Sequence, residues 1–194
     1  MRFKGSSIPE VGRLLATLAA QRPRGRIAEI GTGCGVGTAW LASVLGPEGF
    51  LVTVETDESR AGAVGRLFAD VPQVQVLHGD WHAVLPAEAP FDLVFFDGGQ
   101  WKRLDVVAES EALLALVAPT GTVVIDDMTP PALWPPEWRG RPDPVREFWL
   151  GDPRLRAVEI LTSAETAAIV ATKAPQIDAF SNPSNEGSSP ERAG

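Results

Sequence analysis

The most constrained part of the sequence runs from Ile27 to Thr38, where an apolar run meets an acid and then four glycines at alternate positions (IAEIGTGCGVGT). Ile27, Ala28 and Ile30 predict a short buried strand, and the segment from Thr38 to Leu45 predicts a helix. Glycines are needed between them because some φ angles must be positive and a ligand must approach the main chain closely. The segment therefore predicts a site for a small nucleotide-like molecule, between a strand end and a helix start.

The glycine spacing argues against a dinucleotide. A dinucleotide fingerprint needs G-x-G-x-x-G/A, with a small third residue. Counting from Gly31 puts Val36 at that third position, and counting from Gly33 puts Thr38 there. Glu29, two residues before the first glycine, repels phosphate and suits a ligand that carries positive charge. The segment reads E-x-G-x-G-x-G instead.

Three later segments are short apolar runs that each end in an acid. They are LVTVE ending at Glu55, VQVLHGD ending at Asp80, and FDLVFFD ending at Asp97, and a further run, GTVVIDD, ends in Asp126 and Asp127. Such runs alternate with helical stretches, which predicts a parallel sheet with helices on both faces. Strands are expected near residues 27–30, 51–55, 74–78, 91–96, 121–126, 157–161 and 167–172, and helices near 8–21, 37–45, 58–69, 101–117 and 143–151.

In this order, the motifs resemble those of the class I S-adenosylmethionine-dependent methyltransferases. The segment Asp97-Gly98-Gly99, the helical stretch Trp101–Val117 and the GTVVIDD run narrow the resemblance to the small O-methyltransferases, related to the catechol and caffeoyl-CoA enzymes. The resemblance extends from about Ile8 to Lys173. It implies an α/β fold with a Rossmann-like doubly wound sheet, mostly parallel, with an antiparallel hairpin at the C-terminal end.

The resemblance also implies a binding site for S-adenosyl-L-methionine. The glycine loop would pass the methionine part, Glu55 would accept hydrogen bonds from both ribose hydroxyls, and Asp80 would accept one from the adenine amino group. An apolar neighbour, Trp81, would cover the adenine ring. The residues expected to bind the cofactor are Glu29, Gly31, Thr32, Gly33, Gly35, Glu55, Asp80, Trp81 and Asp97.

Asp97, Asp126 and Asp127 are the expected metal ligands. They follow two strands that are neighbours in this fold, and like charges packed closely repel unless a cation neutralises them. Oxygen ligands suit Mg²⁺. Catechol-type relatives use two acids and an amide here, so Asp127 replaces the amide. The alternative is that these acids act only as hydrogen-bond and electrostatic partners, without a metal.

The catalytic base is less well defined by the sequence. A phenol with a pKa of about 10 stays protonated at neutral pH, so its methylation needs a base, a metal or both. Gln100 stands where relatives carry a lysine or histidine, and glutamine cannot take a proton. Lys102 is the candidate replacement and acts beside Asp97; alternatively it is an exposed lysine at a helix start. His78 and His82 are interpreted as structural.

The chain is expected to be one methyltransferase domain over residues 1–174, followed by a disordered tail over 175–194. Within it, Thr129–Pro144 contains six prolines together with Trp134 and Trp138, which excludes a regular helix or central strand. We interpret 129–144 as a lid insertion over a planar acceptor. The tryptophans alternatively close the sheet edge or form a dimer contact.

Composition limits the possible partners and the location. The formal net charge is −8, and this disfavours nucleic acid because phosphate contacts dominate that affinity. The longest apolar run, Ala112–Ala118, is too short to span a membrane, and the N-terminus lacks a signal-peptide core. A single cysteine fits a reducing compartment, so a cytoplasmic protein is expected. Because related small methyltransferases frequently dimerise, a homodimer is a further possibility.

The function that these features predict is S-adenosylmethionine-dependent transfer of a methyl group to a hydroxyl of a small molecule, a phenol or catechol, with possible assistance by a metal. Two other functions stay open from the sequence. One is a non-catalytic protein that binds S-adenosylmethionine, because Gln100 leaves no clear base. The other is an NAD-linked oxidoreductase on a similar sheet.

Overall fold

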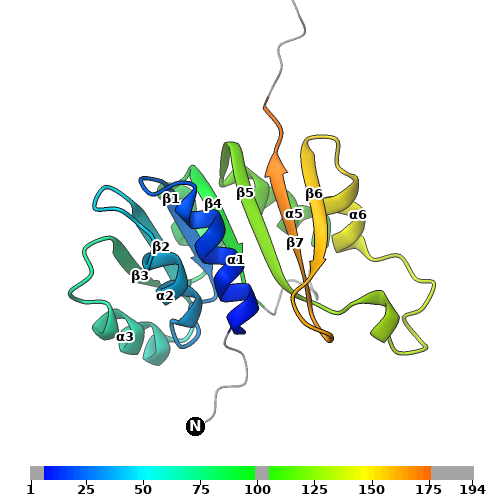
Figure 1. The fold of residues 1–194 in the computed structure, drawn as a ribbon, viewed down its shortest axis with the longest axis horizontal. Coiled ribbons are helices and arrows are strands. Elements are labelled where there is room, and N and C mark those ends of the chain that lie inside the picture. Colours follow the sequence, from blue (N-terminus) through cyan, green and yellow to red (C-terminus); the bar gives the residue numbers. More distant parts are fainter. Residues whose placement is uncertain (1–6, 99–104, 176–194) are drawn as a thin grey trace, which may run out of the picture.

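A computed structural model describes residues 7–98 and 105–175. Within these ranges one sheet of seven strands has the order β3-β2-β1-β4-β5-β7-β6 (Figure 1). The strands are β1 (Arg26–Ile30), β2 (Phe50–Glu55), β3 (Val74–His78), β4 (Phe91–Phe96), β5 (Val117–Met128), β6 (Leu155–Leu161) and β7 (Ala167–Lys173). Strands β1 to β5 pair in parallel, and β7 runs antiparallel between β5 and β6. The predicted doubly wound sheet with its antiparallel hairpin is confirmed.

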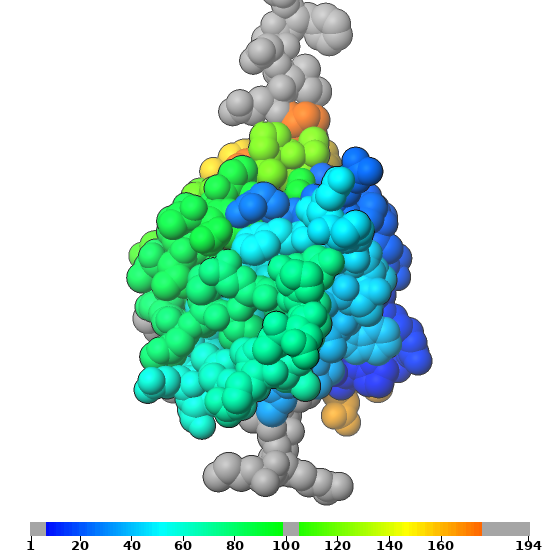
Figure 2. All heavy atoms as spheres, turned by 90° about the vertical axis from the view of Figure 1, so that its left-hand side faces the viewer, coloured from blue at the N-terminus to red at the C-terminus, as the bar shows by residue number. Residues whose placement is uncertain are grey.

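Helices cover both faces of this sheet. They are α1 (Pro9–Ala20), α2 (Val36–Ala42), α3 (Glu58–Leu67), α4 (Trp81–Val84), α5 (Val106–Ala115) and α6 (Pro144–Gly151), with short 3₁₀ turns η1 (Leu85–Ala87) and η3 (Pro131–Leu133). In Figure 1, α1, α2 and α3 lie in front of the sheet and α5 lies behind it. Figure 2 shows the β3 edge, where the chain between β2 and β4, coloured cyan to green, forms most of the visible surface. None of the helices in the described ranges is long and apolar enough to cross a membrane.

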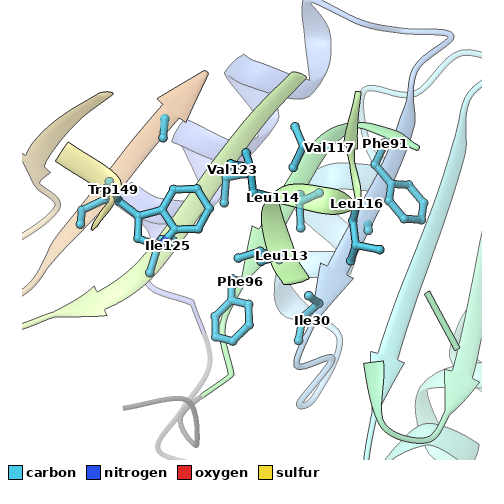
Figure 3. Close-up of a cluster of buried hydrophobic side chains, with 14 of the residues drawn as sticks. Ile30, Phe91, Phe96, Leu113, Leu114, Leu116, Val117, Val123, Ile125 and Trp149 are labelled. Carbon is cyan, nitrogen blue, oxygen red and sulfur yellow. The ribbon is translucent and has the colours of Figure 1, made fainter. Parts of the chain in front are cut away.

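Two apolar clusters hold the layers together. One lies between the sheet and α5 and α6, and Figure 3 shows Trp149 beside Ile125 within it. The Trp149 ring is fully buried, and its Nε1 donates to Ser110 Oγ at 3.0 Å, so the burial leaves no polar atom of the indole unsatisfied. The other cluster packs Leu15 of α1 and Leu41 of α2 against β4. Because both faces are covered, the central strands are mainly apolar, and Glu29 of β1 and Thr53 of β2 are buried exceptions.

The aspartates Asp57, Asp105 and Asp143 begin α3, α5 and α6. Each side chain accepts backbone N–H bonds from the first turn of its helix. The expected helix over 101–117 is wrong at its C-terminal end, because α5 stops at Ala115 and β5 begins at Val117. Residues 101–104, at its other end, lie outside the described ranges.

Strand β5 is also longer than the expected 121–126, at both ends. Its first part contains Pro119 and a residue in the left-handed region, Thr120 with φ 61°, and its pairing with β4 shifts register there. An interruption of this kind hides the strand from a search for regular alternation. Segment 129–144 contains the short turn η3 and, at Pro144, the first residue of α6, and its prolines prevent a longer helix or a strand. Of the tail predicted to be disordered, 176–194 lie outside the described ranges.

Candidate active site

The glycine loop lies between β1 and α2, at the point where the strand order reverses. Strand β1 pairs with β2 on one side and with β4 on the other, and ligands bind at such points in open α/β sheets. Gly31, Gly33 and Gly35 have φ angles of 98°, 54° and 81°. A Cβ atom at Gly31 would lie 2.7 Å from the carbonyl oxygen of Asp97. The loop therefore passes directly against the end of β4, which only glycine allows.

Beneath the loop lies a chain of buried polar side chains around Glu29. The Oε2 atom of Glu29 accepts hydrogen bonds from Thr38 at 2.5 Å and Thr53 at 2.6 Å. Because Thr53 uses its only proton there, Thr32 donates to Thr53, at 2.6 Å. Burial raises the pKa of Glu29 to about 7, against the lowering effect of the two threonines. These hydrogen bonds thus connect Thr32 of the loop and Thr38 of α2 to β1 and β2. Contact of Glu29 and Thr32 with a cofactor stays a prediction.

Glu55, the last residue of β2, connects the glycine loop to that strand. Its Oε2 accepts the backbone N–H of Gly33 at 2.9 Å, and its Oε1 accepts the N–H of Asp57 and the guanidinium of Arg60, each at 2.9 Å. The acid at the end of β2 therefore lies beside the glycine loop, as the ribose role requires. A bound ribose diol would share this carboxylate with Arg60, an interaction that sequence reasoning missed.

The turn after β3 carries Asp80, Trp81 and His82. Asp80 accepts a hydrogen bond from the backbone N–H of His82 at 3.0 Å, and His82 Nδ1 lies 2.8 Å from the same Asp80 oxygen. These bonds lower the pKa of Asp80. The Trp81 ring stacks on His82 with centroids 3.7 Å apart and meets Phe96 edge-on at 6.2 Å. His82 Nε2 lies 3.0 Å from Glu109 of α5, so His82 links this turn to α5.

Two of the three candidate metal ligands follow directly paired residues. Phe96 of β4 pairs with Ile125 of β5, which places Asp97 and Asp126 side by side at the sheet edge. Asp126 is buried, whereas Asp127 is exposed and adopts a φ of 58°. Adjacent residues of a strand project to opposite faces, which is consistent with the different exposure of Asp126 and Asp127.

No metal site is confirmed by this geometry. Within 7–98 and 105–175, no group of three or more His, Cys, Asp or Glu side chains converges to hold a metal ion, and this includes the three aspartates. Gln100 and the candidate base Lys102 lie outside these ranges. The roles predicted for Asp97 and Lys102 in catalysis, and for Asp97, Asp126 and Asp127 in metal binding, therefore stay predictions.

A pocket of about 360 Å³ opens where β5 ends. It is lined by Val106, Met128, Thr129, Trp134, Trp138, Arg141, Pro142, Asp143, Pro144, Val145 and Arg146. Trp134 Nε1 donates to the Thr129 carbonyl at 3.0 Å, and the Arg146 guanidinium lies 5.4 Å from the centre of the Trp134 ring. The Pro/Trp-rich segment thus forms a wall of this pocket.

Arg146 holds that wall to the rest of the fold. Its guanidinium pairs with Glu159 of β6 at 2.6 Å and with Asp143, and also donates to the Thr129 carbonyl at 2.9 Å. The bonds to Glu159 and, to a smaller extent, Asp143 raise the pKa of Arg146. The sequence offered no signal for this network, because Glu159 lies on a different element from the other partners.

The glycine loop at the reversal of the strand order, with an acid at the end of β2 beside it, is the arrangement expected of a class I methyltransferase site. Comparison with known proteins agrees: the family described as "Methyltransferase domain" matches residues 28–128. A protein of Mycobacterium tuberculosis named Probable O-methyltransferase Rv1220c is 31% identical over 173 residues, which cover 86% of this chain and 69% of that protein. The chain belongs to the S-adenosylmethionine-dependent O-methyltransferases, and the NAD-linked alternative is set aside.

Solved structures show the same fold. The O-methyltransferase TomG from Streptomyces achromogenes, involved in tomaymycin synthesis and solved with S-adenosylmethionine, superposes with a TM-score of 0.68 at 26% identity, covering 88% of this chain and 82% of that one. An O-methyltransferase from Bacillus cereus, solved with S-adenosylhomocysteine, gives a TM-score of 0.68 at 24% identity, covering 88% and 84%. At this identity, the similarity to the Bacillus cereus enzyme shows a shared fold and nothing about activity.

Proposed function

We propose that this O-methyltransferase acts on a hydroxyl of a small planar acceptor, a phenol or catechol, which occupies the pocket at the end of β5. The observation that carries the proposal is the position of this pocket. Its lining residues Met128 and Thr129 directly follow Asp126 and Asp127, at the edge of the sheet where the glycine loop also lies. Its volume falls within the range of small-molecule sites, and indole rings favour flat ligands.

On the donor side, the chain's contribution is to orient the cofactor. Glu55 and the glycine loop are already joined by the Gly33 hydrogen bond, so the loop is held in shape before a ligand binds. The transfer is an in-line displacement: the bond from the methyl carbon to sulfur breaks as the bond to the acceptor oxygen forms. Good alignment of donor and acceptor alone supplies on the order of 7–11 kcal/mol of barrier reduction.

On the acceptor side, the hydroxyl must lose its proton. Asp97 is the described residue that we place nearest to this hydroxyl, because its backbone N–H donates to Ile30 beside the glycine loop and its neighbour across the sheet is Asp126. Two adjacent carboxylates, completed by water, are a donor set that Mg²⁺ accepts. A bound Mg²⁺ would acidify the acceptor hydroxyl and orient it. Lys102 is retained as the candidate base.

The test is turnover of S-adenosylmethionine with a panel of phenols and catechols, followed through formation of S-adenosylhomocysteine. The expected result is turnover of catechols that Trp134→Ala reduces strongly while cofactor binding, measured by calorimetry, is unchanged. As a matched control, Trp40→Phe on α2, away from the pocket, should keep turnover.

Two results would contradict the proposal. Binding of S-adenosylmethionine without turnover of any member of the panel would favour the non-catalytic alternative. Turnover that is indifferent to Trp134→Ala would remove the pocket from the reaction.

A further inference from the structure

We propose that the acceptor pocket selects molecules that carry a negative group beside the aromatic ring, and that Arg141 binds this group. The inference rests on the proposed function and names the substrate class more closely: a hydroxylated aromatic carboxylate. It depends on how the charged side chains of the pocket wall are distributed.

Arg141 lines the pocket and has no charge partner of its own. Across 7–98 and 105–175, its side chain makes no hydrogen bond and no ion pair. Its backbone is nevertheless fixed, because its N–H donates to the Trp138 carbonyl at 3.1 Å and the residue before it, Gly140, supplies a φ of 75°. The turn therefore holds Arg141 at the pocket rim next to Trp138, with its guanidinium available to a ligand.

The other charged residues of the wall are already paired. Asp143 accepts bonds from the backbone N–H groups of Val145 and Arg146 and also pairs with the Arg146 guanidinium. Arg146 is further bound by Glu159, which does not line the pocket, and its side chain is only 12% exposed. Among the described residues that line the pocket, Arg141 is thus the positive charge left for a ligand.

The chemistry of this arrangement favours a carboxylate over a neutral group. A guanidinium presents parallel N–H donors that match a carboxylate in both charge and shape. Apart from Thr129 and the paired Asp143 and Arg146, the rest of the wall is apolar or aromatic. Trp134 and Trp138 suit the flat face of a ring. A ring that carries a hydroxyl and a carboxylate satisfies both parts of the wall together.

The experiment compares binding of protocatechuate with binding of its neutral amide, which has the same ring and hydroxyls. Affinity is measured by calorimetry on the full chain, without S-adenosylmethionine and then with S-adenosylhomocysteine. We expect the carboxylate to bind about tenfold more tightly than the amide at low salt, and this ratio to shrink as ionic strength rises.

The variants assign the preference to one residue. Arg141→Gln should bring the ratio close to one, and Arg141→Lys should keep part of it because the charge remains. Arg139→Gln is the matched control: Arg139 is two residues away on the same segment, lies outside the pocket lining and bonds the Trp134 carbonyl through Nε. It should retain the ratio.

The inference is overturned if the wild-type protein does not distinguish the acid from the amide, or if Arg141→Gln keeps the distinction. Should Arg141→Gln unfold, the salt dependence of the wild-type ratio and the Arg141→Lys result decide the question. If the carboxylate preference is absent but catechol is still turned over, the proposed function stands and this inference alone fails. Absence of turnover with the carboxylate preference present would instead overturn the proposed function alone.

Discussion

The Nε2 atom of His82 lies 3.0 Å from Oε2 of Glu109, which ties the turn after β3 to α5. The other ring nitrogen of His82 lies 2.8 Å from Asp80, the residue expected to meet the adenine amino group. An imidazole held from both sides has a fixed ring orientation, and it stacks on Trp81. We therefore assign His82 a role in positioning Asp80 and Trp81.

His82→Ala should weaken binding of S-adenosylmethionine about fivefold. This corresponds to roughly 1 kcal/mol, the typical cost of losing a hydrogen bond, here the one that orients Asp80. Calorimetry checks the affinity. Glu109→Gln should give a smaller loss in the same direction, because it retains a hydrogen-bond acceptor for the ring. His78→Ala is the control, since His78 contacts only the Thr56 carbonyl at 3.2 Å in the described structure. Equal losses for His82→Ala and His78→Ala would argue against the positioning role.

Glu29 predicts a pH dependence of stability. The ordinary glutamate pKa of 4.5 is raised to about 7 in the folded protein by burial. The folded state therefore binds more protons than the unfolded state between these values, and the free energy of unfolding falls as pH rises through that window. The fall attributable to Glu29 is at most about 3 kcal/mol.

Glu29→Gln should remove this fall, because glutamine is neutral at every pH. Urea unfolding at pH 5, 6, 7 and 8 (roughly the window set by the raised pKa) measures it. The exposed Glu48, paired with Arg24 at the surface, supplies the control substitution Glu48→Gln, which should leave the profile as in the wild type. A Glu29→Gln protein with the same loss of stability between pH 5 and 8 would disprove the assignment.

Glu55→Gln should weaken binding of S-adenosylmethionine by about 1–3 kcal/mol, because one charged acceptor for the ribose hydroxyls and the Gly33 N–H is lost. Glu58→Gln, three residues further along and exposed at the start of α3, is the matched control and should bind normally. Unchanged affinity of the Glu55 variant, measured by calorimetry, would refute the ribose assignment.

Gly31→Ala should destabilise the protein by more than about 1 kcal/mol, because it combines a φ of 98° with a Cβ placed 2.7 Å from the Asp97 carbonyl oxygen. Gly65→Ala on α3 is the opposite case, with nothing within 4 Å of its added Cβ. It should stabilise the protein by about 0.5–1 kcal/mol, the usual gain of alanine in a helix. Thermal melts of the two variants test both signs; a neutral Gly31→Ala would show that the loop relaxes freely away from β4.

Turnover is expected to require Mg²⁺ held by Asp97 and Asp126. Excess chelator, Asp97→Asn and Asp126→Asn should each abolish turnover of catechol, and added Mg²⁺ should restore only the chelated wild type. Asp127→Asn should remain active, because the catechol-type relatives that the sequence resembles carry an amide at this position. Full activity in excess chelator would remove the metal and leave the methyltransferase assignment standing.

Much of the fold follows from local pattern. The strands near β1 to β4 and the β6–β7 hairpin were placed within a few residues, because each is a short apolar run bounded by turn residues or an acid. The start of β5 was missed because Pro119 and Thr120 interrupt its alternation. The acids at the ends of β2, β4 and β5 were located for the same local reason, and their shared edge follows from parallel pairing.

Spacing along the chain was enough to predict a strand near 27–30 followed by a glycine loop and a helix, and the order in which the acids follow their strands. The folded structure was needed to show which distant groups meet: Glu55 with the Gly33 N–H, His82 with Glu109, and Arg146 with Glu159. It also decided that Glu29 is buried and that Arg141 keeps an unpaired charge at the pocket. These outcomes depend on how packed elements bring long side chains together and exclude water from them, which local propensity does not specify.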